Sequence, residues 1–204
     1  MEDIASIMMS KSFWAYLILP LLALDCLTLQ AKAGNLSGAS PGDLIFREGN
    51  EAISGMVLTM DNGHFSHVGL LAKQEGEWVV IHSTPSEIEG RIDGVVIDPV
   101  EFFISPQRSR HHAVYRVEAT DDQREHAVSW AMNQEGTPFS VLSPEGIYCT
   151  TLVWKAWQSA GLDLEAQFTH VAIPLAEGDF LLPSGLLSSS KLTLLEPEAL
   201  SVQQ

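Results

Sequence analysis

The strongest clue to the fold of this chain is the stretch Tyr148-Cys149-Thr150-Thr151-Leu152-Val153-Trp154-Lys155-Ala156-Trp157. Its apolar residues recur at helical spacing, which predicts a helix that begins at Cys149, ends at Gly161 and packs on a sheet. Cys149 is the single cysteine after residue 33. A lone thiol at the positive end of a helix is typical of a nucleophile, and a buried structural cysteine is the alternative.

A hairpin that carries two histidines is predicted earlier in the chain. Two strand-like runs, Ser66–Ala72 and Glu77–Ser83, flank Lys73–Gly76, whose polar residues and glycine suit a four-residue loop. With that loop, residues i and 149 − i oppose each other, so His67 lies opposite His82. Directly opposed residues share a face of the sheet, with Cβ atoms about 4.5 to 5.5 Å apart. We therefore expect the two imidazoles to lie in contact.

Hairpin and helix together offer the parts of an activated thiol. A helix end stabilises a nearby anion by about 0.3 to 1 kcal/mol, whereas lowering a thiol pKa by about three units needs about 4 kcal/mol. An imidazolium from His67 is expected to supply the difference and to protonate the leaving group. His82 is the expected third member, which fixes the tautomer of His67. If the loop register differs, the third role falls to one of three acidic residues: Glu75, Glu77 or Asp93.

The composition is that of a globular protein with an exported leader. The formal charge of −15 excludes nucleic acid as an expected partner. The apolar run Phe13–Leu24 is too short to span a bilayer comfortably, and Ala31–Ala33 has the small-x-small pattern of a cleavage site. Residues 1–33 are therefore expected to be a signal peptide, or an N-terminal anchor if uncleaved. We expect a periplasmic or secreted protein that meets a membrane only through an uncleaved leader.

The rest of the chain predicts one α+β domain over residues 34–183. Strands are expected after the turn at Pro41-Gly42 and over Ala113–Val117, and Thr120 with Gln123 forms the capping box of a helix that ends at Gly136. A small antiparallel sheet packed against the Cys149 helix follows from these elements. Residues 184–204 show little pattern and are expected to be a partly disordered tail.

Several segments resemble the YiiX/YebB-like branch of the permuted NlpC-type, papain-like cysteine hydrolases. They are Gly42–Phe46, Phe65–Leu70, His82, Gly136–Phe139 and Tyr148–Trp154. The resemblance implies a circularly permuted papain-like (NlpC-type) fold in which the histidine strand precedes the cysteine helix. It also implies Cys149 as nucleophile, His67 as base and His82 as third member. Tyr148, Thr150 and Ser66 are the candidate pocket residues. Thr150-Thr151 and Phe139-Ser140 depart from the family pattern, so substrate contacts are expected to differ.

Three functions fit these residues. The first is an exported thiol hydrolase that cleaves an amide bond, with a peptidoglycan peptide as the favoured substrate. The second is a lipid or ester acyl hydrolase or acyltransferase of the same fold, and the third is a non-catalytic module that binds cell wall or lipid. No cofactor or metal is expected. A zinc site of His64, His67, His82 and Cys149 is disfavoured, because strand residues three apart point to opposite faces.

Overall fold

The computed structural model describes residues 36–142, 146–173 and 176–195. The expected leader, residues 1–33, lies outside this part of the chain, as do residues 196–204. Within the described part, no helix has the length and apolar character needed to cross a membrane.

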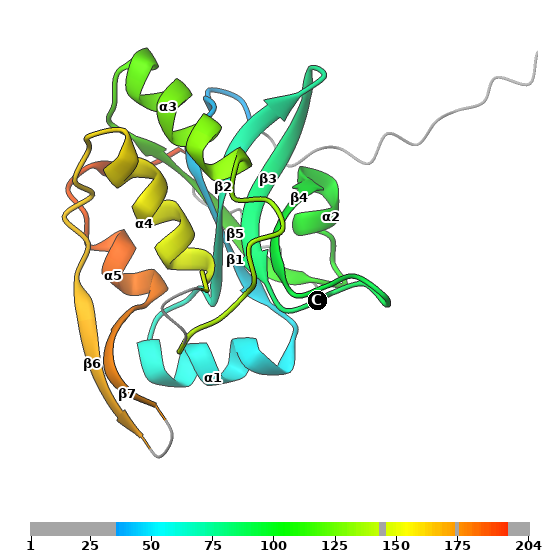
Figure 1. The fold of residues 1–204 in the computed structure, drawn as a ribbon, viewed down its shortest axis with the longest axis vertical. Coiled ribbons are helices and arrows are strands. Elements are labelled where there is room, and N and C mark those ends of the chain that lie inside the picture. The colour runs from blue at the N-terminus through cyan, green and yellow to red at the C-terminus, as the bar shows by residue number, and fades with distance from the viewer. Residues whose placement is uncertain (1–35, 143–145, 174–175, 196–204) are drawn as a thin grey trace, which may run out of the picture. The chain divides into compact units, whose positions relative to one another are not determined.

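A six-stranded antiparallel sheet, in the order β4-β3-β2-β1-β5-β8, forms the centre of the fold (Figure 1). The strands are β1 (Leu44–Gly49), β2 (His67–Gln74), β3 (Glu77–Thr84), β4 (Gly94–Pro99), β5 (Ser109–Val117) and β8 (Leu192–Leu194). A separate hairpin pairs β6 (Phe168–Ile173) with β7 (Ala176–Leu181). The histidine strand therefore lies inside the sheet, with a neighbour on either side.

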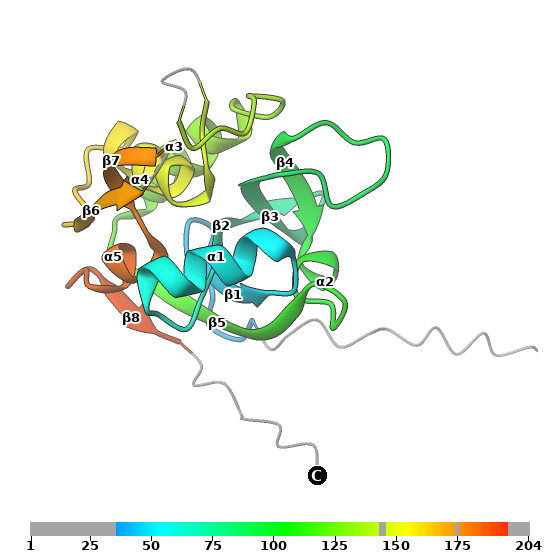
Figure 2. The same ribbon diagram turned by 90° about the horizontal axis from the view of Figure 1, so that it is seen from below.

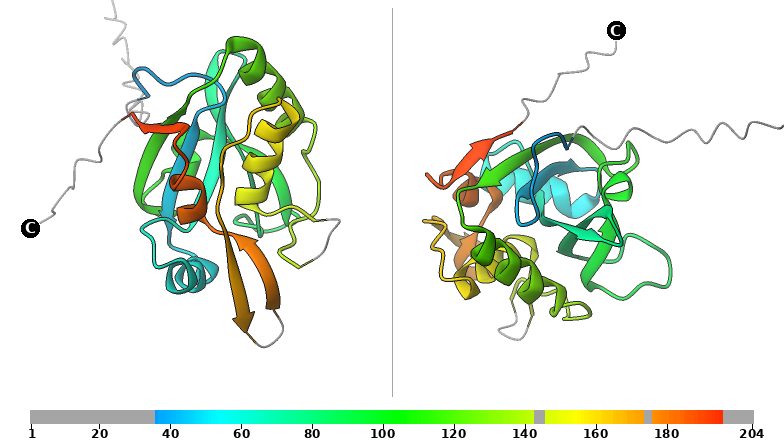
Figure 3. Two further views of the ribbon diagram at one scale, coloured as in Figure 1. Left: turned by 90° about the vertical axis from the view of Figure 1, so that its left-hand side faces the viewer. Right: turned by 90° about the horizontal axis from the view of Figure 1, so that it is seen from above.

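Helices cover both faces of the sheet. Along β1, Leu44 and Phe46 belong to the core beneath α3 (Asp121–Met132) and α4 (Cys149–Ser159), which lie side by side on one face (Figure 3). Ile45 belongs to a second core on the opposite face, which includes residues of α2 (Val100–Phe103). This alternation is the period-two pattern of a strand buried on both faces. The expected α+β fold is confirmed.

Two further helices lie near one end of the sheet. Figure 1 shows α1 (Ala52–Asp61) below β1 at this end, on the same side of the molecule as the β6–β7 hairpin, and Figure 2, seen from below, shows α1 in front of β1. The last turn of α1 is tied to α5 (Pro183–Leu187), because Asp61 Oδ2 accepts a hydrogen bond of 2.9 Å from the backbone N–H of Ser184. The chain before β2 and the chain after β7 thus meet at this end.

Local sequence explains the two long helices on the first face. Thr120 and Gln123 form the predicted capping box at the start of α3. At the start of α4, the hydroxyl of Thr151 accepts the N–H of Tyr148 at 3.1 Å. Residues of α4 at helical spacing are buried in the core, as predicted: Leu152, Val153, Ala156 and Trp157. Cys149 is consequently held at the first turn of a helix anchored on the sheet.

The predicted hairpin register is wrong by two residues. Leu70 pairs with Ile81 and Leu71 with Val80, so paired numbers add to 151 rather than 149. The loop is a two-residue turn in which Glu75 and Gly76 have φ of 54° and 91°, values that a type I′ turn requires. His82 therefore lies beside Gly69 and diagonal to His67. A shift of two keeps both histidines on the same face, which is why the predicted contact survives.

The domain also extends beyond residue 183, where the sequence placed its end. Residues 184–195 complete α5 and form β8, which pairs with β5 from Tyr115 to Val117. Leu186 is fully buried in the main core. The weak hydrophobic pattern of this segment concealed its packing because both elements are short.

Candidate active site

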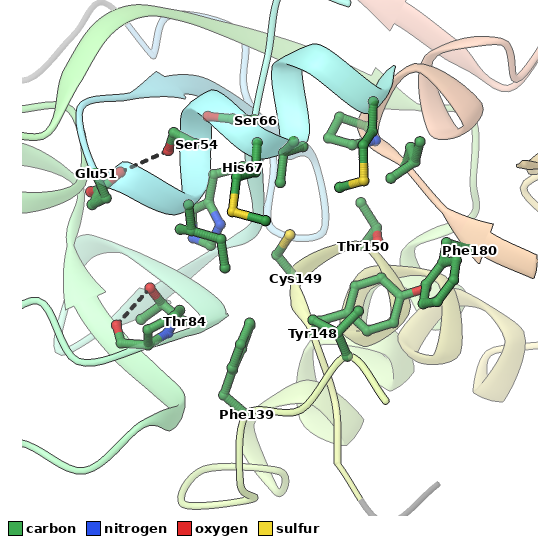
Figure 4. Close-up of a pocket in the computed structure, with 18 of the residues that line it drawn as sticks. Glu51, Ser54, Ser66, His67, Thr84, Phe139, Tyr148, Cys149, Thr150 and Phe180 are labelled. Atoms are coloured by element: carbon green, nitrogen blue, oxygen red, sulfur yellow. Dashed lines mark hydrogen bonds between the residues drawn. The ribbon is translucent and has the colours of Figure 1, made fainter. Parts of the chain in front are cut away.

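Cys149 and His67 line one cavity of about 480 Å³ at the end of the sheet where α1 lies. Cys149 comes from the first turn of α4 and His67 from the first residue of β2. Figure 4 shows both side chains directed into the pocket, with Thr84 on the side of His67 and Tyr148 and Phe180 on the opposite side. The thiol and the imidazole named from the sequence thus line the same pocket.

A chain of hydrogen bonds leads away from His67 into the protein. His67 Nε2 lies 2.9 Å from His82 Nδ1, and the other nitrogen of His82 lies 3.1 Å from Asp98 Oδ2. Arg91 Nη1 in turn donates to both oxygens of Asp98, at 2.7 and 3.0 Å. His67 Nε2 is committed to His82, so Nδ1 is the ring nitrogen that remains for the pocket.

Both imidazoles are neutral at neutral pH. Burial lowers the pKa of His67 well below its usual value, and the positive charge of Arg47 lowers it further. Burial also lowers the pKa of His82, although the hydrogen bond to Asp98 opposes this effect. The pKa of Asp98 is lowered: burial raises it, but hydrogen bonds from His82 and Arg91 outweigh that effect. The network therefore holds one carboxylate and two uncharged rings.

The thiol is also uncharged, contrary to the expectation of a thiolate–imidazolium pair. Burial raises the pKa of Cys149 to about 11, although backbone groups of Val68 and Thr150 hydrogen-bond the sulfur and oppose this shift. Desolvation outweighs the helix end because the nearby imidazole carries no charge with which to pair. The resting site holds a thiol beside a neutral base.

Arg47 is a buried cation next to this site that was not predicted from the sequence. Its guanidinium donates to the carbonyl of Phe103 at 2.9 Å and forms ion pairs with Glu51 and Glu87. It also lies 4.4 Å from the centre of the Phe103 ring, which stacks on His67. Arg47 shares a face with Ile45 and directly follows three apolar residues of β1, and a charge at such a position was the signal available in the sequence.

Asp98 is the second missed residue, and it replaces the acidic alternatives named from the sequence. Glu75 and Glu77 are exposed at the far end of the hairpin, and Asp93 accepts the backbone N–H of Ser86 at 2.8 Å. Asp98 follows three apolar residues in β4 and is buried. A buried acid in an apolar run was again the signal in the sequence.

The three predicted pocket residues all line the cavity. The hydroxyl of Ser66 accepts the N–H of Gly49 at 2.9 Å. Thr150 donates to the carbonyl of Leu181 at 2.6 Å, and the hydroxyl of Tyr148 accepts the N–H of the same residue at 3.0 Å. Tyr148 and Thr150 therefore fasten the end of β7 to the start of α4, which fixes one side of the pocket.

The site offers a candidate metal-binding cluster whose donors, apart from Nδ1 of His67, are already engaged. His67, His82 and Glu87 place ligand atoms within 4.8 Å of one another, whereas His64, part of the zinc alternative, is exposed and outside the cavity. The two rings bond each other, and Glu87 pairs with Arg47 and Arg108. A cation would have to displace these bonds beside a buried guanidinium, so the residues do not fit a metal.

The sequence of the described domain matches a known family. Residues 39–195 match the family described as permuted papain-like amidase enzyme, YaeF/YiiX, C92 family. The chain belongs to this family. Among curated proteins, no match was found. The crystal structure of the metalloprotein YiiX from Escherichia coli O157:H7 is similar, with a TM-score of 0.65 and 19% identity over 78% of this chain and 97% of that one. The permuted papain-like fold expected from the sequence is confirmed.

Proposed function

We propose that this chain is a thiol amidase in which Cys149 is the nucleophile, His67 the base and His82 its hydrogen-bonded partner. The observation that carries the proposal is the shared pocket: the thiol and His67 line one cavity, and the far nitrogen of His67 is bonded to His82. Thiol, base and orienting group are the three parts that acyl transfer by a cysteine needs. Membership of an amidase family supports the same reaction.

The neutral resting state sets the order of proton movements. As the sulfur attacks the substrate carbonyl carbon, the thiol proton passes to Nδ1 of His67, and a C–S bond forms. The backbone N–H of Cys149, at the start of α4, is the proposed donor to the oxyanion. The imidazolium is a strong acid here because burial and Arg47 lower the pKa of His67. It therefore returns its proton readily to the leaving amine.

Loss of the amine breaks the C–N bond and leaves a thioester on Cys149. Water then attacks the thioester carbonyl, with His67 again taking a proton, and the sulfur leaves as the thiol once that proton returns to it. The products are a carboxylic acid and an amine, and the enzyme regains its starting state.

Cys149→Ala is the decisive variant for this mechanism. Turnover is expected to fall by roughly 10⁴-fold, because the remaining groups supply no nucleophile. Mixing wild type with an activated ester of the same acyl group should add the mass of one acyl group to the protein, and Cys149→Ala should gain none. His64→Gln is a matched control, since His64 is exposed and outside the cavity. Retained activity in Cys149→Ala would overturn the proposal.

Metal dependence is the rival chemistry, since YiiX is named a metalloprotein. We propose a metal-independent reaction because the two histidine nitrogens bond each other and Glu87 is paired with Arg47. A chelator such as EDTA should leave the rate unchanged, whereas alkylation of Cys149 should abolish it. Loss of activity on chelation, with recovery on adding zinc, would contradict this part of the proposal.

The lining of the pocket favours an acyl substrate over a peptide. We name two groups of lining residues by their chemistry. The polar wall is Arg47, Ser66, His67, Thr84 and Glu87, and the apolar wall is Ile53, Met56, Val57, Met60, Phe139, Val141, Leu142, Val171, Phe180, Leu181, Leu182 and Pro183. The apolar wall forms most of the surface that a substrate would meet beside Cys149. The volume of the whole pocket, about 480 Å³, suits a small-molecule ligand, since such pockets measure about 300 to 1,000 Å³.

Polar groups of the pocket are committed to the fold. The hydroxyls of Ser66 and Thr150 bond backbone groups, and Glu51 bonds Arg47 and Ser54. A peptide that carries charged groups would lose water on entering and gain few partners. A peptidoglycan peptide, the favoured substrate on sequence, stays a prediction, and an aliphatic acyl amide is the second candidate that this lining supports. Export of the chain is likewise part of the proposal.

A series of anilides with acyl groups from acetyl to dodecanoyl separates the two substrates. Burial of each added methylene is worth about 0.8 kcal/mol, so kcat/KM should rise about fourfold per methylene until the pocket is filled. Purified muropeptides serve as the alternative substrate, with Cys149→Ala as the blank for both. A flat anilide series together with cleaved muropeptides would favour the peptide.

A further inference from the structure

The proposed base works only if the proton of neutral His67 sits on Nε2, and the His67–His82 pair alone does not ensure this. Two neutral imidazoles joined by one hydrogen bond have two arrangements. Either His67 Nε2–H donates to His82 Nδ1, or His82 Nδ1–H donates to His67 Nε2. In the second arrangement Nδ1 of His67 carries a hydrogen and cannot take the thiol proton. Some other group must decide between them.

We propose that Asp98, held by Arg91, is the positioning residue that decides the direction of both hydrogen bonds. This inference rests on the proposed roles of Cys149 and His67. An ionised carboxylate only accepts hydrogen bonds, so His82 Nε2, at 3.1 Å from Asp98 Oδ2, must carry its proton. A neutral His82 then has no proton on Nδ1 and accepts from His67 Nε2–H at 2.9 Å. The Nδ1 lone pair of His67 is thereby left for Cys149.

Arg91 fixes the direction of these hydrogen bonds by keeping Asp98 an acceptor. Its Nη1 donates to both oxygens of Asp98, at 2.7 and 3.0 Å, which keeps the carboxylate ionised and fixed in orientation. Asp98 is buried in β4, and its partner His82 is fully buried in the adjacent strand β3. Protonating this carboxyl would turn a donor toward His82 or Arg91 and lose a charge-assisted bond. Asp98 is separated from the sulfur by two imidazole rings, and it nevertheless sets the tautomer of His67.

The packing around the rings leaves the orientation little freedom. The Phe103 ring lies 5.5 Å from the ring of His67 and 5.0 Å from that of His82. Rotation of either ring would bring it against the Phe103 ring, so proton placement rather than ring rotation is what Asp98 controls.

Asp98→Asn is the most informative variant, because it should reverse the donor and acceptor in both the His82–residue 98 and the His67–His82 hydrogen bonds. Arg91 donates more closely to Oδ1, so the asparagine oxygen is expected at that place and its NH₂ at the place of Oδ2. The NH₂ would donate to His82 Nε2, moving the proton of His82 to Nδ1 and that of His67 to its own Nδ1. A charge-assisted hydrogen bond is worth enough to lower kcat roughly 10- to 100-fold when it is lost. KM should change little, because no substrate contact is removed.

Long-range ¹⁵N spectra of labelled protein report the tautomers directly, without substrate. Wild type should show Nε2–H on both His67 and His82, and Asp98→Asn should show Nδ1–H on both, with kcat lowered. Asp93→Asn is the matched control, as an exposed aspartate that precedes the same strand, and should change neither spectrum nor kcat. Nδ1–H on His67 in wild type, or unchanged tautomers and kcat in Asp98→Asn, would overturn the inference. The spectra stand apart from turnover, so failure of Cys149→Ala to lose activity would overturn the amidase proposal alone.

Discussion

The two walls of the pocket are built in opposite ways. The polar wall is fixed by hydrogen bonds and ion pairs at every step, from His67 through His82 to Asp98 and around Arg47. The apolar wall is lined by side chains of α1, the 139–142 segment and the β6–β7 hairpin, and several are open to solvent: Met56 is 60% exposed and Leu142 62%. The polar groups of one wall are held by bonds within the protein, whereas the other wall leaves apolar side chains exposed to solvent.

In the proposed reaction, this difference would separate the residues that carry the chemistry from those that select the substrate. Proton transfer needs groups held to within a fraction of an ångström, which the buried network of the polar wall provides. Binding an apolar chain needs area and adaptable side chains, which methionines on α1 provide. Changes to the polar wall should therefore alter kcat or stability, while changes to the apolar wall should alter substrate preference.

Among the changes that compare the two walls, replacing His67 should have the largest effect, and it tests whether the polar wall carries the chemistry. His67→Gln removes the proton acceptor next to a thiol whose pKa is raised to about 11, so little thiolate forms at neutral pH. General acid–base catalysis contributes about 10²- to 10⁴-fold, and we expect kcat to fall by a factor in this range. Rates with the anilide series measure it. A His67→Gln enzyme that keeps its kcat would place the base elsewhere.

A pair of glycine-to-alanine variants compares how tightly the protein is packed near each of the two walls. An ideal Cβ on Gly69 would lie 2.2 Å from Val80 Cγ1, so Gly69→Ala forces atoms apart beneath His82 and should destabilise the fold by about 1 to 3 kcal/mol. Gly55, in α1, has no heavy atom within 4 Å of its ideal Cβ, and Gly55→Ala should stabilise that helix by about 0.5 to 1 kcal/mol. Urea unfolding curves measure both. Equal effects would show that the walls do not differ in packing.

The contact between the two histidines was predictable from the sequence even though the register was not. Strand residues alternate between faces, so any error of two residues in the loop leaves His67 and His82 on one face. The turn was missed because Glu75 adopts a left-handed conformation with φ of 54°, which is uncommon for glutamate. The start of α4 at Cys149 was predictable for a similar reason, since a local helical pattern carries it.

The charges around the site were not predictable from local pattern. Asp98 reaches His82 from β4, and Arg47 reaches Glu87 from β1, so both contacts depend on the order of strands in the sheet. The raised pKa of Cys149 likewise depends on burial that only tertiary packing creates. The local sequence pattern identified Cys149 and His67 as the proposed nucleophile and base, and tertiary burial sets the pKa values of both groups.

Acid should weaken the polar wall through its histidines. The pKa values of His67 and His82 are lowered in the folded state, so the unfolded chain binds more protons below the unfolded value of about 6.5. The contribution of the two histidines to the free energy of unfolding is therefore fully present above about pH 6.5. Below that pH it falls by up to about 1.4 kcal/mol per pH unit for each histidine. Unfolding at pH 7 and pH 5.5 should show a smaller difference in His67→Gln than in wild type. His64→Gln, which alters an exposed histidine, should behave like wild type.

Met56→Gln tests the apolar wall with the smallest expected change. Glutamine has nearly the length of methionine, so the variant replaces apolar contact with a polar group while it keeps the bulk of a side chain that is 60% exposed and lines the cavity. Losing part of the burial of one methionine is worth about 1 kcal/mol, so the ratio of kcat/KM for dodecanoyl over acetyl anilide should fall about fivefold. Ile92→Gln is the control, because Ile92 is 86% exposed and does not line the pocket. An unchanged ratio in Met56→Gln would mean that the acyl chain does not lie along α1, and the apolar wall would lose its role in selectivity.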